Sequence, residues 1–234
     1  MDANNTWKWS TCMTCLLRHV KTHAVLIIHV LLLTACATQP PSDPQHIGIV
    51  TTWHGLPSVT RNGKTYLLSN QSRIYPGDIV KNDGTSQVNI HMIDDTQIIL
   101  GGESHFVFHE YDFVPGSFFP TARMTFASGR MRARTENVTR AWFGQFKIQT
   151  PLATIQPDTA DFWAEVTSKD NRLEVIMLEG KQVQVGNDHG SVQIKRQQFG
   201  TTVRAGSAPK TPQIWSKRAL DSIRKSTAPR GPDQ

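Results

Sequence analysis

Hydrophobic and polar residues alternate along much of the chain. In the segment 87–92, Val88, Ile90 and Met92 are separated by polar residues, and two valines in the segment 182–185 follow the same pattern. A period of two is typical of β-strands that bury one face and expose the other. The pattern therefore predicts a sheet with one face turned toward a core.

Turn-forming residues separate these runs. Gly and Asn tolerate positive φ and Pro fixes φ for a turn, and such residues recur about every 8 to 12 positions, a spacing typical of all-β domains. The turn signals are 61–64, 75–78, 82–84, 94–95, 101–102, 179–180 and 186–188. We read 77–78 and 94–96 as hairpin turns.

One short helix is expected near the C-terminal end. It follows Thr211-Pro212-Gln213 and places Ile214, Leu220 and Ile223 on one side, with basic residues elsewhere. The predicted fold is therefore all-β, a short-stranded sandwich or β-solenoid-like domain with one short C-terminal helix.

Residues 1–35 have the pattern of an export signal. A ten-residue apolar run, AVLIIHVLLL at 24–33, follows the basic residues Arg18 and Lys21. Ten helical residues span about 15 Å, half of the roughly 30 Å hydrocarbon core of a bilayer. The run therefore predicts a cleaved signal peptide rather than a membrane-spanning anchor. Translation can start at Met1 or at Met13.

The four residues Leu33-Thr34-Ala35-Cys36 resemble the lipobox of bacterial lipoproteins. The resemblance implies that the Cys36 thiol receives a diacylglyceryl group, that the signal is cut before it, and that several acyl chains hold the mature N-terminus on a membrane. Ala37, where some lipoproteins have Asp, implies sorting to the outer membrane, facing the periplasm. The alternative is an ordinary signal peptide with an accidental cysteine.

Cysteine and proline positions support this division of the chain. All three cysteines lie at or before residue 36, so the mature domain has no disulfide to form, and the Cys12-x-x-Cys15 pair falls inside the predicted signal. Three prolines in 37–46 suit a solvated tether. We expect a lipidated Cys and tether at 36–46, a β domain at 47–206, and a basic tail with the short helix at 207–234.

The positive charge is concentrated in that tail. The 234-residue chain has a formal net charge of +6, and residues 195–234 carry nine basic against two acidic side chains. A basic tail can bind anionic lipid, polysaccharide or nucleic acid by charge, or it can serve only to keep the protein soluble. The predicted exported address argues against nucleic acid.

Four segments carry a family resemblance. They are GDIVKNDGTSQVNIHMIDDTQIIL (77–100), IQTPLATI (148–155), LEGKQVQV (178–185) and GTTVRAG (200–206). In this order they resemble the FecR-type domain family, over about 47–206. The Gly-rich loop of that family is replaced by 156–162, QPDTADF, which lacks the glycines that adopt positive φ easily. Members that act as anti-sigma regulators also have a cytoplasmic helical region and a membrane-spanning helix, which the predicted lipoprotein signal does not provide.

No catalytic pattern emerges. The chain has no G-x-S-x-G, P-loop or dinucleotide fingerprint. Asp94, Asp95, Glu103 and Glu110 stand in turn and strand contexts where solvated surface is expected. His105 and His109 share a strand face but lie about 13 Å apart, too far to bind one metal ion with bonds near 2 Å, and His91 would have to join one of them across strands. We expect no cofactor, no metal and no enzymatic activity.

Two groups are candidate partner-binding residues. Arg130, Arg132 and Arg134 have strand parity and are expected on one face, where they either grip phosphate or carboxylate groups or pair with carboxylates on an edge strand. Phe118-Phe119 lies in a predicted loop as an exposed contact. Most other aromatic residues, Trp142 included, are expected in the core.

The sequence thus predicts a non-catalytic binding or scaffolding module of the bacterial envelope. Its membrane contact is the N-terminal lipid, and its partner is an envelope protein, peptidoglycan or another anionic polymer. The competing hypothesis is a ligand sensor or envelope enzyme whose site the sequence does not reveal.

Overall fold

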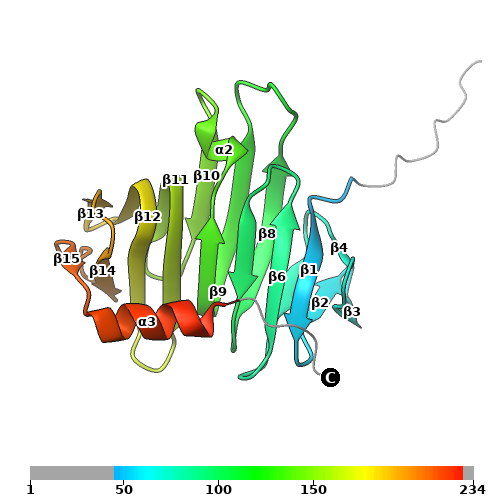
Figure 1. Ribbon diagram of the computed structural model, residues 1–234, viewed down its shortest axis with the longest axis horizontal. Coiled ribbons are helices and arrows are strands. Elements are labelled where there is room, and N and C mark those ends of the chain that lie inside the picture. The colour runs from blue at the N-terminus through cyan, green and yellow to red at the C-terminus, as the bar shows by residue number, and fades with distance from the viewer. Residues whose placement is uncertain (1–44, 229–234) are drawn as a thin grey trace, which may run out of the picture. The chain divides into compact units, whose positions relative to one another are not determined.

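The computed structural model describes residues 45–228. The predicted signal peptide, Cys36 and the tether up to residue 44 lie outside the described residues. The described part consists mainly of strands, which confirms the all-β prediction (Figure 1). No helix in this part is long and apolar enough to span a membrane.

The elements follow one another with short connections. The strands are β1 (Gly48–His54), β2 (Ser58–Arg61), β3 (Lys64–Leu67), β4 (Arg73–Ile74), β5 (Ile79–Lys81), β6 (Gln87–Met92), β7 (Gln97–Leu100), β8 (His105–Asp112), β9 (Thr121–Arg134), β10 (Gln145–Gln149), β11 (Thr154–Thr167), β12 (Arg172–Asn187), β13 (Gly190–Ile194), β14 (Phe199–Arg204) and β15 (Gln213–Ile214). The described helices are α2 (Asn137–Arg140) and α3 (Lys217–Ser226).

All described strands belong to one sheet. Its main order is β15-β14-β12-β11-β10-β9-β7-β6-β1-β4; β8 pairs with β9 and continues through β5 to β2 and β3, and β13 pairs with β12. Among these pairs β9 and β10 are parallel, and the others are antiparallel. Most strands are short, as predicted, but β9, β11 and β12 have 14 to 16 residues.

The long strand β9 joins two parts of the sheet. Its first part, 121–128, pairs with β8 and β10, and its second part, 129–134, pairs with β7 and β11. Gly129 stands between the two parts with φ +90, and a Cβ there would lie 2.5 Å from Ser104. Only glycine fits this position, because it alone combines free positive φ with so close a backbone approach.

The buried face is the one that the alternation predicts. Val88, Ile90 and Met92 on β6 are at most 1% exposed, and Val183 and Val185 on β12 are fully buried. One apolar cluster runs through nearly all the strands, so the domain has a single main core without any cysteine. The predicted half-buried strands are confirmed.

The C-terminal helix begins later than the sequence pattern indicates. Gln213 and Ile214 form β15, and α3 begins at Lys217 because the Ser216 hydroxyl accepts a hydrogen bond from the Ala219 amide and caps the helix. Leu220 and Ile223 pack in a second cluster with β11 and β12 side chains. The described part of the segment after 206 therefore packs on the sheet (Figure 1).

The two predicted turns differ from each other. Asp94 and Asp95 form the β6–β7 hairpin turn, as expected, with Asp95 at φ +71. The turn at Gly77-Asp78 is not a hairpin, because β4 and β5 pair with other strands. Asp78 is instead buried and accepts two hydrogen bonds of 2.7 Å from the Arg61 guanidinium.

Candidate binding surface

Four aromatic side chains form an exposed cluster, called here the aromatic tip. Phe118 and Phe119 belong to the β8–β9 loop and are 61% and 68% exposed. Trp142 and Phe143 lie between α2 and β10 and are 85% and 57% exposed. The expectation of an exposed Phe118-Phe119 loop agrees with the structure, whereas Trp142, expected in the core, is on the surface.

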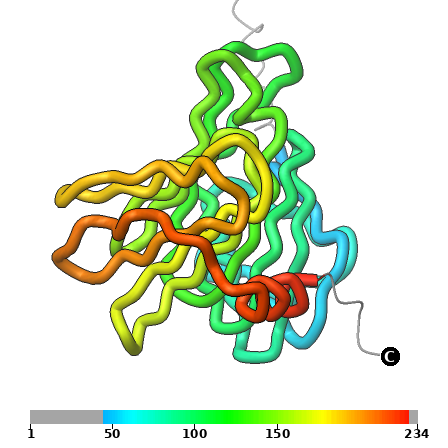
Figure 2. Tube along the Cα trace, turned by 60° about the vertical axis from the view of Figure 1, so that its left-hand side comes forward, coloured from blue at the N-terminus to red at the C-terminus, as the bar shows by residue number. Residues whose placement is uncertain are grey.

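The two segments of the tip are held side by side (Figure 1 and Figure 2). The Phe143 amide donates to the Phe118 carbonyl at 3.1 Å, and the Gln145 amide donates to the Pro120 carbonyl at 2.9 Å. The Phe119 and Phe143 rings stack with centroids 5.0 Å apart. The parallel pairing of β9 with β10 brings these segments together, because it sets the starts of both strands at the same level.

A buried carboxylate supports the tip from below. Asp94 is fully buried, which corrects the expectation of a solvated turn residue. One carboxylate oxygen accepts hydrogen bonds from the Tyr111 hydroxyl at 2.6 Å and the Thr96 amide at 3.0 Å. The other accepts from the Thr96 hydroxyl and from the Val138 amide, both at 2.9 Å. Asp94 thus joins the β6–β7 turn, β8 and α2.

Tyr111 acts in this arrangement as a neutral donor. Burial and the neighbouring Asp94 carboxylate raise the pKa of Tyr111 well above its ordinary value. Its ring meets the ring of Phe146 edge to face, with centroids 6.4 Å apart. Phe146 is the second residue of β10, so the same contact fixes the strand that follows Trp142 and Phe143.

The tip is apolar and uncharged, with charges only at its base. The segments 113–120 and 141–145 contain no Asp, Glu, Lys or Arg. Arg140 at the end of α2 pairs with Glu136 at 2.7 Å, and Arg123 pairs with Glu110. The tip therefore offers ring surface, without a charged side chain, to whatever it contacts.

The three candidate arginines lie on one face of β9, as their parity predicts. The intervening Met131 and Ala133 are fully buried. β9 is an interior strand, so the edge-strand setting considered for these arginines is not the one found.

Each of the three guanidinium groups lies near a carboxylate. Arg132 donates to both oxygens of Asp161 at 2.8 and 2.7 Å, and this pairing raises the pKa of Arg132. Arg130 lies 3.8 Å from Glu165, whose pKa is raised by burial against the opposing effect of Arg130. Arg134 lies 3.6 Å from Glu136.

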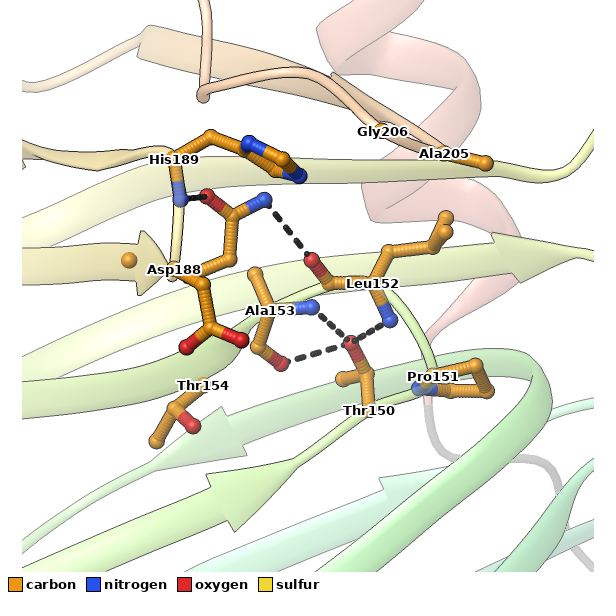
Figure 3. A pocket seen from close by; sticks show the side chains of 11 residues that line it. Thr150, Pro151, Leu152, Ala153, Thr154, Asp188, His189, Ala205 and Gly206 are labelled. Carbon is orange, nitrogen blue, oxygen red and sulfur yellow. Dashed lines mark hydrogen bonds between the residues drawn. The ribbon is translucent and has the colours of Figure 1, made fainter.

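A shallow polar pocket of about 360 Å³ lies at the turn that follows β10 (Figure 3). Its rim is tied together by Asn187, whose side chain donates to the carbonyls of Leu152 and Ser207. Thr150 closes the turn by accepting from the Leu152 and Ala153 amides. These contacts hold together the loops that line the pocket.

The histidines considered as metal ligands do not gather at one site in the described part of the chain. His91 lies 3.4 Å from Asp95, and His109 is hydrogen-bonded to the Thr125 hydroxyl at 2.8 Å. Within residues 45–228, no group of three or more His, Cys, Asp or Glu side chains is placed to hold a metal ion.

Comparisons with known proteins agree with the resemblance in the sequence. Residues 78–184 match the family model described as FecR protein, which confirms the resemblance over that segment. Among curated proteins, no sequence matches this chain.

Two solved structures have a similar arrangement. Both are of a candidate anti-sigma factor from Parabacteroides distasonis ATCC 8503, with identities of 12% and 11% and a TM-score of 0.48 in each case. The matches cover 62% of this chain and 63% and 62% of the solved chains.

Proposed function

We propose that this chain, which contains a FecR-type domain, is an exported, lipid-anchored protein of the outer membrane that acts in the periplasm as a non-catalytic binding module. The binding surface is the aromatic tip. The FecR-type domain supports an envelope-related regulatory or binding role, and the lipobox resemblance at Cys36 supports the anchor.

The exposure of the tip carries this proposal. Four large aromatic side chains between 57% and 85% exposed lie together, whereas Phe106, Phe108 and Phe126 of the same sheet are fully buried. Burying a large apolar side chain stabilises a protein by about 1.5 to 3 kcal/mol. A group of neighbouring aromatic side chains left in water, two of them stacked on each other, marks a contact surface.

The arginine face is the weaker candidate for the main contact. Asp161 already satisfies Arg132 in a bidentate pair, so an incoming phosphate or carboxylate would have to displace it. Arg134 is the most exposed of the three, at 64% of its side chain. We assign Arg130 and Arg132 to the cohesion of β9 and β11 first, and the three arginines together to an anionic envelope polymer second.

A photo-cross-linking experiment tests the binding surface. A photoreactive phenylalanine analogue replaces Phe119 in the full chain expressed in cells, and the control carries it at Tyr66, which is 50% exposed on β3. We expect a discrete adduct to lipid or protein from the Phe119 position alone. Equal adduct patterns from both positions contradict the assignment of the aromatic tip.

A further inference from the structure

The chain enters the domain at the end that carries the aromatic tip. The Ile93 amide donates to the Ile47 carbonyl at 3.0 Å, and the next residue, Asp94, accepts from the Val138 amide of α2. The tip begins four residues after Val138, at Trp142. Figure 1 shows the start of β1 and α2 toward the same end of the sheet.

This placement limits how the domain can stand relative to a membrane. Residues 36–46 span at most about 36 to 40 Å when fully extended, since a chain extends about 3.3 to 3.6 Å per residue. A lipid on Cys36 would therefore keep Ile47, at the end of the domain that carries the tip, within about 40 Å of the bilayer surface. The remote end of the domain has no such restraint.

We propose that the aromatic tip inserts into the surface of the membrane that carries the lipid anchor. This inference rests on the proposed function, because it takes the anchor at Cys36 as given. The N-terminal lipid and the tip then form two contacts on one end of the domain, and the second contact sets its orientation.

The composition of the tip favours lipid over a protein partner. Its loops hold aromatic rings, Val114, prolines and glycines with no charge, and Val114 is itself 62% exposed. Trp prefers the membrane interface, where its apolar face meets acyl chains and the indole N–H stays near headgroups, and Phe is typical of apolar faces buried at the acyl boundary. Protein hot spots instead combine aromatic residues with arginine in desolvated pockets, and each arginine at the base of this tip is paired with a carboxylate.

The orientation has a structural consequence. β10 runs five residues away from the tip, about 16 Å at the usual strand rise, and ends at the turn that lines the polar pocket. With the tip in the membrane, this turn points away from the bilayer. The pocket and the turn of Asn187 would then be presented to the periplasm.

Depth-dependent fluorescence quenching tests the insertion. The lipidated protein isolated from cell membranes, from which cleavage before Cys36 removes Trp7 and Trp9, is reconstituted in vesicles of phosphatidylethanolamine and phosphatidylglycerol, with and without bromine on the acyl chains. We expect brominated lipid to quench tryptophan emission, and Trp142→Phe, which keeps an aromatic ring, to lose most of that bromine-dependent quenching. The matched control Trp215→Phe keeps it, because Trp215 packs against the α3 cluster.

A second variant leaves the reporter in place. Phe118→Ser with Phe119→Ser is expected to shift the Trp142 emission to the red and reduce its quenching, while the melting temperature stays unchanged because both rings are exposed. Leu67→Ser, at a leucine 66% exposed on β3, is the control for loss of an apolar side chain elsewhere. Equal quenching in the wild type and Trp142→Phe overturns the inference.

The two proposals fail separately. If Trp142 is not quenched but the Phe119 cross-linker captures a protein, lipid insertion is wrong and the binding module stands. If bromine quenches Trp142 but a fatty-acid label persists in Cys36→Ala, insertion is supported and the anchor assignment is wrong. Absence of both quenching and adduct overturns both.

Discussion

Replacing Asp94 by Asn is the sharpest test of how the tip is supported. The amide keeps the shape of the carboxylate, and its oxygen can still accept from the Tyr111 hydroxyl and the Thr96 amide. Its NH₂ group then faces the Val138 amide, which lies 2.9 Å from the oxygen it replaces. Two donors cannot bond to each other, so the Val138 N–H is left buried without a partner.

The expected cost follows from these bonds. An unsatisfied buried donor costs about 1 to 3 kcal/mol, and the remaining bonds lose the strength that a charged acceptor provides. We expect Asp94→Asn to lower the free energy of unfolding by about 2 to 4 kcal/mol. Tyr111→Phe, which removes one bond to the charged group, should cost about 1.5 to 3 kcal/mol.

Urea unfolding of the full chain, followed by circular dichroism, measures both values. Hydrogen exchange gives the local readout, because the Val138 amide should lose protection in Asp94→Asn and keep it in Tyr111→Phe. A loss below about 0.5 kcal/mol for Asp94→Asn, at the level of an ordinary surface substitution, would refute the view that this carboxylate holds the turn and α2 together.

Three further outcomes are expected. Cys36→Ala should abolish incorporation of a fatty-acid analogue in growing cells, and persistent label contradicts the lipoprotein assignment. Arg132→Gln should destabilise the domain by about 1 to 3 kcal/mol, because it leaves the nearly buried carboxylate of Asp161 without its bidentate partner. Arg134→Gln should change the free energy of unfolding by less than about 0.5 kcal/mol. Equal losses for the two variants in urea titrations contradict this. Thr159→Gly relieves φ +42 but also removes the 3.3 Å hydrogen bond between the Thr159 and Thr139 hydroxyls, so it is compared in a Thr139→Ala background, where it should raise the melting temperature; a lower value there would show that the Thr159 backbone is not strained.

Thr159 lies in the segment where this chain departs from the FecR-type family pattern. The segment 156–162 lacks the glycines of the FecR-type loop, so the sequence suggested that the geometry of that loop could not be carried over. In the structure this segment lies within strand β11, and Thr159 has positive φ beside Ala160, whose partner on β12 is Gly180 at φ +116. A Cβ on Gly180 would lie 2.4 Å from the Thr159 carbonyl, so the glycine on the neighbouring strand leaves room for that carbonyl.

The strands and the core could be predicted because they depend on local alternation. Val88, Ile90 and Met92 are buried for the reason visible in the sequence, and the same holds for the valines of β12. Asp94 could not be predicted in this way. A carboxylate in a turn is ordinarily solvated, and the donors that bury it come from Tyr111 and Val138, which are 17 and 44 residues further along the chain.

The aromatic tip could not be predicted from the sequence either, because it also depends on contacts between distant segments. Phe118-Phe119, between Gly116 and Pro120, is recognisable as a loop, but Trp142 resembles an ordinary core residue in the sequence. What exposes Trp142 and Phe143 is the return of the chain through α2 to a parallel β10, which places them beside the β8–β9 loop, beyond the end of the sheet. One local signal of this exposure is Gly144, where a Cβ would lie 1.8 Å from the Val138 carbonyl. So tight a turn directly after the two aromatic residues leaves their side chains without a neighbouring strand to pack against. The contact surface thus arises from a long-range strand pairing, and only its two halves are visible in the sequence.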